Sequence, residues 1–116
     1  MRSIPLFFVL VFLGFTAFAQ PATEQQKIEY LLNAIGSSDV VFIRNGQEYT
    51  PAQAKEHLRM KLGKAGASIR TADEFITLLA SKSSFTGKPY LIRPSDGKTI
   101  ESEKWLREKL AHMEIK

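Results

Sequence analysis

The residues that could carry chemistry in this chain begin with His57, one of two histidines in the sequence. An imidazole paired with a carboxylate can act as a general base and activate a hydroxyl for nucleophilic attack. Glu48 is close to His57 in sequence, and hydroxyls follow at Ser81, Ser83 and Ser84. One hypothesis is therefore a small hydrolase or transferase acting on envelope material, with His57 as base, Glu48 as its orienting partner and one serine as nucleophile.

A packing role for His57 competes with this chemistry. His57 flanks an apolar helical stripe formed by Ala54, Leu58 and Leu62. Amphipathic rings commonly pack at such a half-buried edge. We favour this role, so an enzyme is the second hypothesis and a non-enzymatic binding or adaptor module is the first.

A recognition surface is predicted on the loop from Ser81 to Tyr90 and on the hairpin around Arg44. The loop is dense in hydroxyls and contains Lys88, so its backbone N–H groups and its ammonium group could hold an anion. Its spacing fits neither a P-loop nor a Ser-x-x-Lys acylation motif. Local hydrogen bonds that satisfy the backbone are the simpler explanation of the hydroxyls. The residues that we expect to form the surface are Arg44, Asn45, Glu48, Lys88 and Tyr90.

Two arginines, Arg44 and Arg93, each end an expected strand. Two guanidinium groups can bind one carboxylate or phosphate together. Solvated charges at two strand ends explain them as well, so both interpretations stay open.

The composition argues against several other classes of function. The chain has 116 residues and no cysteine, which excludes disulfides and thiol nucleophiles. Two distant histidines and scattered acids predict no metal site, and no motif predicts a cofactor. The net charge of +4 is too weak to indicate a nucleic-acid partner.

The first nineteen residues are predicted to be a secretory signal peptide. A basic start at Arg2 precedes an apolar run over residues 4–18, and Ala17-Phe18-Ala19 has the form of a cleavage site. An uncleaved membrane anchor is disfavoured because the run is shorter than the roughly 20 residues that span a bilayer. We expect cleavage after Ala19, a periplasmic location and membrane contact only during export. The partner would be an unknown periplasmic protein or an anionic envelope ligand.

The predicted mature chain opens with a helix, a hairpin and a second helix. A capping box at Thr23 predicts a helix over residues 24–36. Asn45-Gly46 lies between two short strand-like runs, which is the strongest short signal for a hairpin. Thr50-Pro51 then predicts the start of a helix that ends between Gly63 and Gly66.

The same order of elements follows in the second half. Thr71 and Glu74 form a second capping-box pattern before an apolar helix. Residues 89–93 and 98–100 read as two strands around a turn. A last helix is expected from Ser102 to about Met113.

The two halves also resemble each other in sequence, which predicts an internal repeat of about 48 residues. Residues 57–62 align with residues 105–110 at a shift of 48, and residues 42–44 align with residues 91–93 at a shift of 49. Chance similarity between amphipathic helices is the alternative.

The predicted fold is therefore one α+β domain over residues 20–116. It consists of two α-β-β-α halves, residues 23–66 and 71–116. Because one hairpin alone is marginally stable in water, we expect the two hairpins to form one small antiparallel sheet packed by about four helices. An alternative keeps each hairpin small and lets the helices supply the core.

Four sequence blocks carry a family resemblance. They read FIRNG-x-E over residues 42–48, HLR-x-KLG over 57–63, TA-x-EFI over 71–76 and AS-x-SS-x-TGKPY over 80–90. In their order and spacing the chain resembles the YfeK-like family of small exported bacterial proteins, a domain of unknown function of the DUF5329 type. The resemblance covers about residues 24–93 well and the last helix weakly. It implies export to the periplasm and supplies neither an activity nor catalytic residues.

Overall fold

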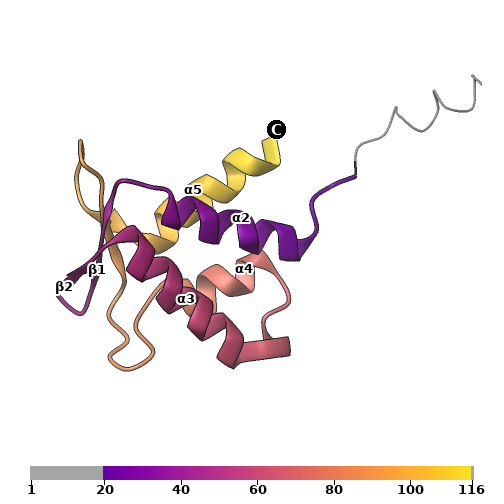
Figure 1. The fold of residues 1–116 in the computed structure, drawn as a ribbon, viewed down its shortest axis with the longest axis horizontal. Helices are drawn as coiled ribbons and strands as arrows, with labels where there is room; N and C mark the ends of the chain where they lie inside the picture. Colours follow the sequence, from indigo (N-terminus) through magenta and orange to yellow (C-terminus); the bar gives the residue numbers. More distant parts are fainter. Residues whose placement is uncertain (1–19, 116) are drawn as a thin grey trace, which may run out of the picture.

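The computed structural model describes residues 20–115 and the side chains as far as Met113. The predicted signal peptide of residues 1–19 lies outside the described residues. The described chain is an α+β fold in which helices and short strands alternate (Figure 1). In chain order its elements are α2 (Glu24–Gly36), β1 (Val41–Arg44), β2 (Gln47–Tyr49), α3 (Pro51–Ala65), the 3₁₀ turn η1 (Gly66–Ser68), α4 (Ala72–Glu74), the π-helix η2 (Phe75–Ala80), β3 (Leu91–Arg93), β4 (Ile100–Glu101) and α5 (Ser102–Ile115).

The helix starts follow the capping residues. Thr23 and Thr50 each begin a complete capping box, with Gln26 and Gln53 returning the second hydrogen bond. Thr71 accepts from the backbone N–H of Glu74, as predicted. The Glu74 carboxylate, however, accepts from the backbone N–H of Arg70 rather than that of Thr71, so this third box is incomplete.

The third helical segment differs from the regular helix that its sequence predicts. After one turn of α-helix it continues as a π-helix over Phe75–Ala80. Two side chains donate hydrogen bonds to the carbonyl groups at its end. The Lys61 ammonium donates to the Leu79 carbonyl at 2.7 Å, and the Ser102 hydroxyl donates to the Ala80 carbonyl at 3.0 Å. A cation at a helix C-terminus is favourable because the last carbonyls carry partial negative charge.

Both hairpins join into one antiparallel sheet of four strands, in the order β2-β1-β3-β4. Its inner face carries one row of side chains that face one another across the strands, Tyr49, Phe42, Ile92 and Ile100. The next row on the outer face consists of Glu48, Ile43, Leu91 and Glu101. The turn of the first hairpin is Asn45-Gly46, and both residues have the positive φ that a type I′ turn requires.

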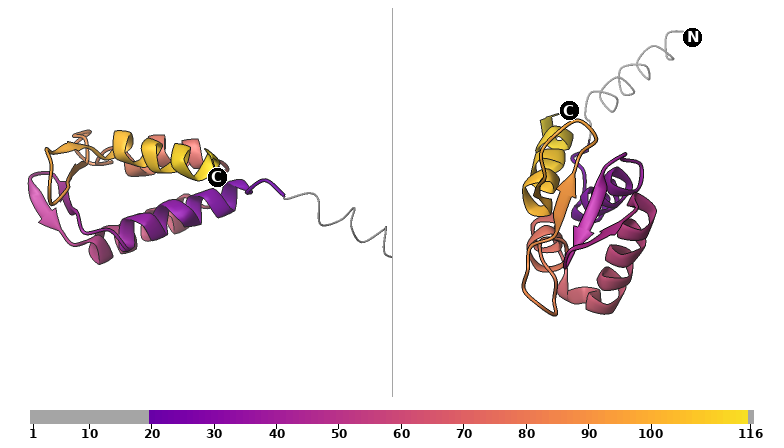
Figure 2. Two further views of the ribbon diagram at one scale, coloured as in Figure 1. Left: turned by 90° about the horizontal axis from the view of Figure 1, so that it is seen from above. Right: turned by 90° about the vertical axis from the view of Figure 1, so that its left-hand side faces the viewer.

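The helices form two layers, and the sheet closes them at one end (Figures 1 and 2). One layer contains α2 and α3, and the other contains the α4–η2 segment and α5 (Figure 2). The core lies between these layers and the inner face of the sheet. Its largest fully buried side chains are Phe75, Ile28, Leu31, Leu32, Ile35, Ile76, Ile92 and Leu106.

The predicted α+β class, with about four helices and one small antiparallel sheet, is confirmed. The packing combines the two arrangements that the sequence left open, because the hairpins do form one sheet while helix-to-helix contacts supply much of the core. None of the described helices is long and apolar enough to cross a membrane.

Replacing a core leucine should destabilise the protein far more than replacing an exposed one. Leu32 is fully buried in α2, whereas Leu78 is 57% exposed. We expect Leu32→Ala to cost about 2–5 kcal/mol in the free energy of unfolding, because a cavity is left behind. Leu78→Ala is the matched control and should change it by no more than about 0.5 kcal/mol. Urea unfolding followed by circular dichroism measures both, and equal losses would contradict this description of the core.

Candidate functional site

A cluster of basic and aromatic side chains lies between α3 and the inner face of the sheet. Arg44 ends β1, on the same face as Phe42. His57 and Lys61 are one helical turn apart on α3, so they share a face of that helix. Tyr49 and Tyr90 complete the group, which we call the cationic cluster: Arg44, Tyr49, His57, Lys61 and Tyr90.

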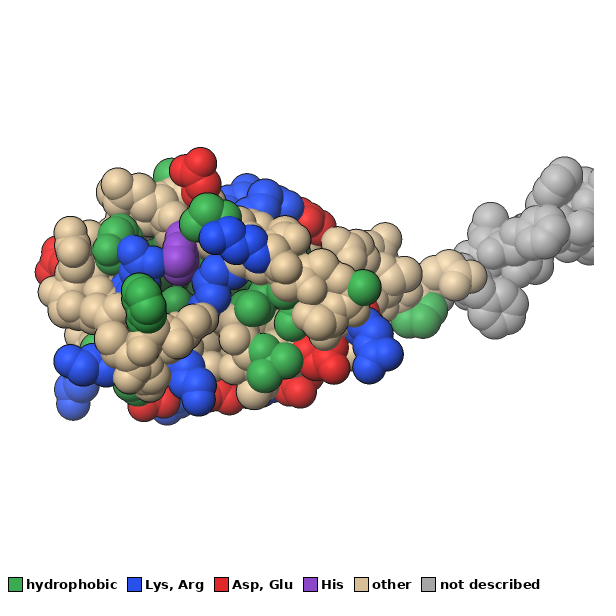
Figure 3. All heavy atoms as spheres, turned by 90° about the horizontal axis from the view of Figure 1, so that it is seen from below, with side chains coloured by type: hydrophobic (Ala, Val, Ile, Leu, Met, Phe, Trp, Pro, Cys, Tyr) green, Lys and Arg blue, Asp and Glu red, His purple; other side chains and the backbone are tan. Residues whose placement is uncertain are grey.

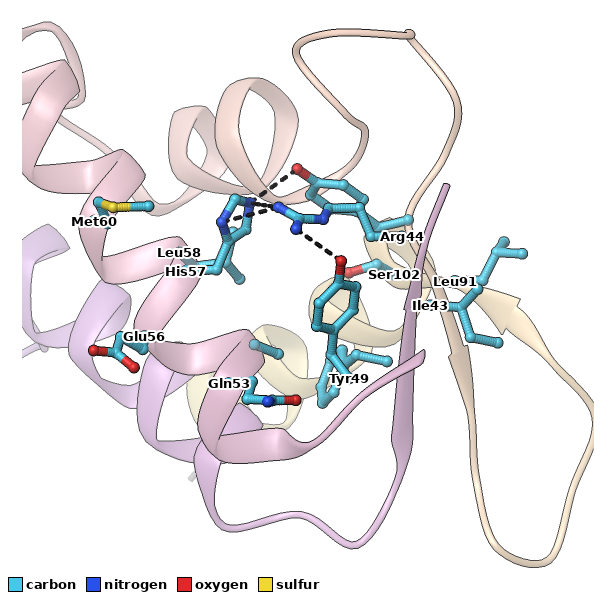
Figure 4. A pocket seen from close by; sticks show the side chains of 13 residues that line it. Ile43, Arg44, Tyr49, Gln53, Glu56, His57, Leu58, Met60, Leu91 and Ser102 are labelled. Atoms are coloured by element: carbon cyan, nitrogen blue, oxygen red, sulfur yellow. Dashed lines mark hydrogen bonds between the residues drawn. The ribbon is translucent and has the colours of Figure 1, made fainter. Parts of the chain in front are cut away.

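Arg44 is the centre of the cationic cluster. Its Nη1 lies 3.1 Å from Nδ1 and 2.9 Å from Nε2 of His57, and its Nη2 donates to the Tyr49 hydroxyl at 2.9 Å. The guanidinium carbon also lies 4.7 Å from the centre of the Tyr49 ring, a cation–π distance. Figure 4 shows these three side chains pointing toward one another across the gap between β1 and α3.

Lys61 is held by neutral oxygens. Besides its bond to the Leu79 carbonyl, its ammonium lies 3.2 Å from the Tyr90 hydroxyl. The same hydroxyl is 3.4 Å from Nε2 of His57. Among the described side chains, residues 20–113, neither Arg44 nor Lys61 forms a salt bridge with a carboxylate.

The protonation states in the cationic cluster follow from burial and from like charges. Burial lowers the pKa of His57, and the charges of Arg44, Lys61 and Lys64 lower it further. Burial, followed by the charge of Arg44, lowers the pKa of Lys61. Because a guanidinium can only donate, its contact with His57 needs the neutral imidazole, which alone has an acceptor nitrogen.

Two adjoining cavities border the cationic cluster. The basic cavity, about 810 Å³, is lined by Arg44, His57, Lys61 and Lys64 together with the loop residues Ser83, Ser84 and Phe85, and no Asp or Glu is among the described residues that line it. On the face shown in Figure 3, a histidine lies among Lys or Arg and hydrophobic side chains, in keeping with this lining.

The second, apolar cavity is about 310 Å³ and extends under the N-terminal part of α3. Phe42, Ala54, Leu58 and Met60 line it, together with the residues of the cationic cluster other than Lys61. Glu56 also borders it, but its carboxylate points away from Arg44 (Figure 4).

The loop beside the basic cavity is fastened to the first hairpin. The Ser83 hydroxyl is buried and accepts from the Asn45 side-chain amide and from the backbone N–H groups of Phe85 and Thr86. The Thr86 hydroxyl in turn donates to Oδ1 of the Asn45 side chain at 2.6 Å. Ser81, Ser83 and Thr86 thus bond to nearby backbone groups, as the simpler explanation supposed. Ser83 and Thr86 also bond to the distant Asn45 side chain.

The structure brings together only some of the predicted recognition residues. Arg44, Asn45 and Tyr90 all line the basic cavity. Glu48 lies on the outer face of the sheet, where its carboxylate pairs with Arg93 at 3.0 Å. Lys88 is exposed and does not line either cavity. Arg44 and Arg93 therefore lie on opposite faces and do not converge on one anion.

The residues of the enzyme hypothesis are likewise dispersed. Glu48, on the outer face, is not hydrogen-bonded to His57. The Ser81 hydroxyl donates to the Thr77 carbonyl, and the Ser83 hydroxyl accepts three N–H groups. Ser84 lines the basic cavity and forms no side-chain hydrogen bond within the described chain. The described contacts of His57 are with Arg44 and Tyr90 rather than with these serines.

Sequence reasoning missed Lys61 and Tyr49. The spacing of four residues between His57 and Lys61 was a usable signal, because residues i and i+4 share a helix face. Tyr49 was harder to find, because its role follows from the strand register that places it opposite Phe42.

The chain is thus a small α+β protein with a basic cleft, and comparisons with known proteins define its family. It matches the model of a family described as a family of unknown function (DUF5329) over residues 22–114. The chain belongs to this family, which confirms the resemblance seen in its sequence blocks. It is also 41% identical over 92 residues to the uncharacterized protein YfeK of Salmonella typhimurium, covering 78% of this chain and 77% of that protein. No solved structure matches.

The lowered pKa of His57 predicts a pH dependence of stability near neutrality. A folded-state pKa below the unfolded value of about 6.5 means that the unfolded chain binds the proton more readily. The contribution of the neutral His57 to the free energy of unfolding is then fully present above about pH 6.5, and it falls as the pH drops toward the folded-state pKa. We expect the melting temperature of the wild type to decrease more between pH 7.5 and pH 5.5 than that of His57→Gln.

The control for this measurement is His112→Gln, which removes the exposed second histidine on α5. It should follow the wild type over the same pH range. A His57→Gln profile parallel to that of the wild type would show that His57 does not titrate with a lowered pKa.

Proposed function

We propose that the protein is an exported, non-enzymatic binding module that acts in the periplasm and recognises an anionic group at Arg44 and Lys61. The observation that carries this proposal is the pair of cations at the basic cavity whose described hydrogen-bond partners are all uncharged. The sequence of residues 1–19, with its apolar run and Ala17-Phe18-Ala19, supports export.

An anion in the basic cavity would relieve an electrostatic cost. Arg44, Lys61 and Lys64 lie close enough that their charges shift the pKa of His57, and Arg44 also lowers the pKa of Lys61. Like charges in a partly desolvated site repel one another, whereas a bound anion favours every charged form. Arg44 also has donors left over, since a guanidinium has five N–H groups and the described bonds involve only Nη1 and Nη2.

We also propose that the two halves arose by duplication, with a shift of 48 for the helices and for the first strand of each hairpin, while the longer turn of the second hairpin places β4 further along the chain. Thr23 and Thr71 both cap helices and are separated by this shift. The buried positions of α2 support it, because adding 48 to each gives another buried residue: Ile28, Leu31, Leu32 and Ile35 correspond to Ile76, Leu79, Ala80 and Ser83. The sequence alignment of the strands used a shift of 49, which would pair residues on opposite faces of the sheet. A shift of 48 pairs residues on the same face, so we use it for the strands as well.

This correspondence singles out the candidate site. It pairs Arg44 with Ile92 and His57 with Trp105. In the second half, Ile92 is fully buried and Trp105 packs edge-on against Phe42. In the first half, the same positions hold a guanidinium and an imidazole beside two cavities. The second half thus has apolar residues where the first half has Arg44 and His57. This difference supports a binding role for the first half.

Inorganic phosphate serves as a simple anionic probe of this proposal. We expect saturable changes in the ¹⁵N-¹H NMR spectrum of the protein that centre on Arg44, His57 and Lys61. In the double variant Arg44→Gln/Lys61→Gln, the dissociation constant should rise about tenfold or more, because hydrogen bonds from charged donors are lost.

The matched control is Arg93→Gln/Lys88→Gln, which removes the same amount of charge from residues outside both cavities. It should bind phosphate as the wild type does. Equal weakening in both double variants would mean that phosphate senses only net charge, and the proposed site would be withdrawn.

A further inference from the structure

We infer that the ligand of this site is a small amphipathic anion, in which one carboxylate or phosphate group is joined to an apolar chain or ring. This rests on the proposed function and adds the chemical class of the ligand. The basic cavity and the apolar cavity share five lining residues, Arg44, Tyr49, His57, Met60 and Tyr90. A molecule with its charged end at Arg44 therefore has apolar walls within its reach.

The apolar cavity suits an uncharged chain or ring. Phe42 and Leu58 are buried, and Ala54 is a small residue that leaves the space between α3 and the sheet unfilled. Its volume of about 310 Å³ lies at the lower end of the range of natural small-molecule sites. Most of its exposed wall is apolar, so an apolar group that enters it removes apolar surface from water.

The mouth of the basic cavity has the same mixed character. Phe85 is 96% exposed and Met60 is 52% exposed, and both line this cavity beside the basic side chains. The loop that carries Phe85 is fixed to Asn45 through Ser83 and Thr86, so the aromatic ring is presented by an ordered backbone. Two exposed hydrophobic side chains therefore adjoin the basic lining, and this combination suits a ligand with both polar and apolar parts.

The polar groups of the cationic cluster determine where the charged end binds. Arg44 crosses from β1 to α3 between the two cavities, and its partners His57 and Tyr49 hold it without neutralising it. Lys61 reaches the same point from α3 through the Tyr90 hydroxyl. A single compact anion can therefore contact both cations, while a second anionic group in the apolar cavity would meet no Lys or Arg other than Arg44 among its described lining residues. This favours a ligand with one charged end.

Octanoate tests the inference directly, with acetate and 1-octanol as partial mimics. We would measure binding to the protein, purified after expression of the full chain, by titration calorimetry at pH 7.5. Octanoate should bind at least about tenfold more tightly than acetate, since burying roughly two methylene groups already produces this factor. It should also bind at least about tenfold more tightly than octanol, since octanol lacks the charge that Arg44 and Lys61 would bind. Arg44→Gln/Lys61→Gln should remove this preference over octanol.

A cavity-filling variant isolates the apolar part. Ala54→Leu places a larger side chain in the apolar cavity and should weaken octanoate binding about tenfold or more, while the NMR response to phosphate stays unchanged and confirms that the variant is folded. Ala52→Leu makes the same substitution at an exposed position of α3 and serves as the control. It should bind octanoate as the wild type does.

The outcomes separate the inference from the proposed function. If phosphate perturbs the cationic cluster but octanoate binds no better than acetate, the amphipathic ligand is overturned and the anion site remains. If octanoate binds equally well without Arg44 and Lys61, the inference also fails, because its charged end would have no role. Absence of any response to phosphate or octanoate overturns both. Binding to vesicles of phosphatidylglycerol without binding of octanoate overturns the small ligand in favour of a lipid surface.

Discussion

The hydrogen bonds that hold Arg44 between β1 and α3 are the interaction on which the rest of the site depends. A guanidinium on the inner face of a small sheet must have acceptors, because a buried unpaired charge is very costly. His57 and Tyr49 supply them. Both partners are neutral, so they satisfy the donors without cancelling the charge, as a carboxylate would. Burial and this contact both favour the neutral imidazole, since its acceptor nitrogen is needed. The cleft thus keeps its positive charge because the hydrogen bonds that hold Arg44 are formed with neutral partners.

Local signals were sufficient to predict most of the elements. Thr23 and Thr50 specify where α2 and α3 begin, because their hydroxyls and the following glutamines satisfy the free N–H groups of the first turn. Asn45-Gly46 specifies the first hairpin, because few other residue pairs adopt positive φ twice in succession. The π-helix of η2 was not predictable in this way. Its carbonyls contact Lys61 and Ser102, which come from elements distant in sequence.

The site was harder to predict than the elements, because it depends on the face that each strand residue presents. Glu48 and Arg44 are four residues apart, yet the turn between them and the register of β2 put them on opposite sides of the sheet. A slip of one residue reverses every side chain of a strand. Sequence proximity therefore suggested a Glu48–His57 pair, whereas Glu48 pairs with Arg93. The sequence did predict Arg44, Asn45 and Tyr90 as site residues. They belong to the first hairpin and to the loop of residues 81–90, which meet at the basic cavity.

The contrast between the two halves explains why such a small domain can contain a cleft. Below about 100 residues a core has little stability to spare, so a cavity next to clustered charges has a noticeable cost. Here α2 and the second half supply the largest fully buried side chains, and Trp105 and Leu106 of α5 are buried against the core. In α3, by contrast, Leu58 is the only buried residue, and space remains beside Ala54. Under the proposed duplication, α2 and the second half supply the core, and this leaves α3 free to keep the charged, partly empty arrangement that binding requires.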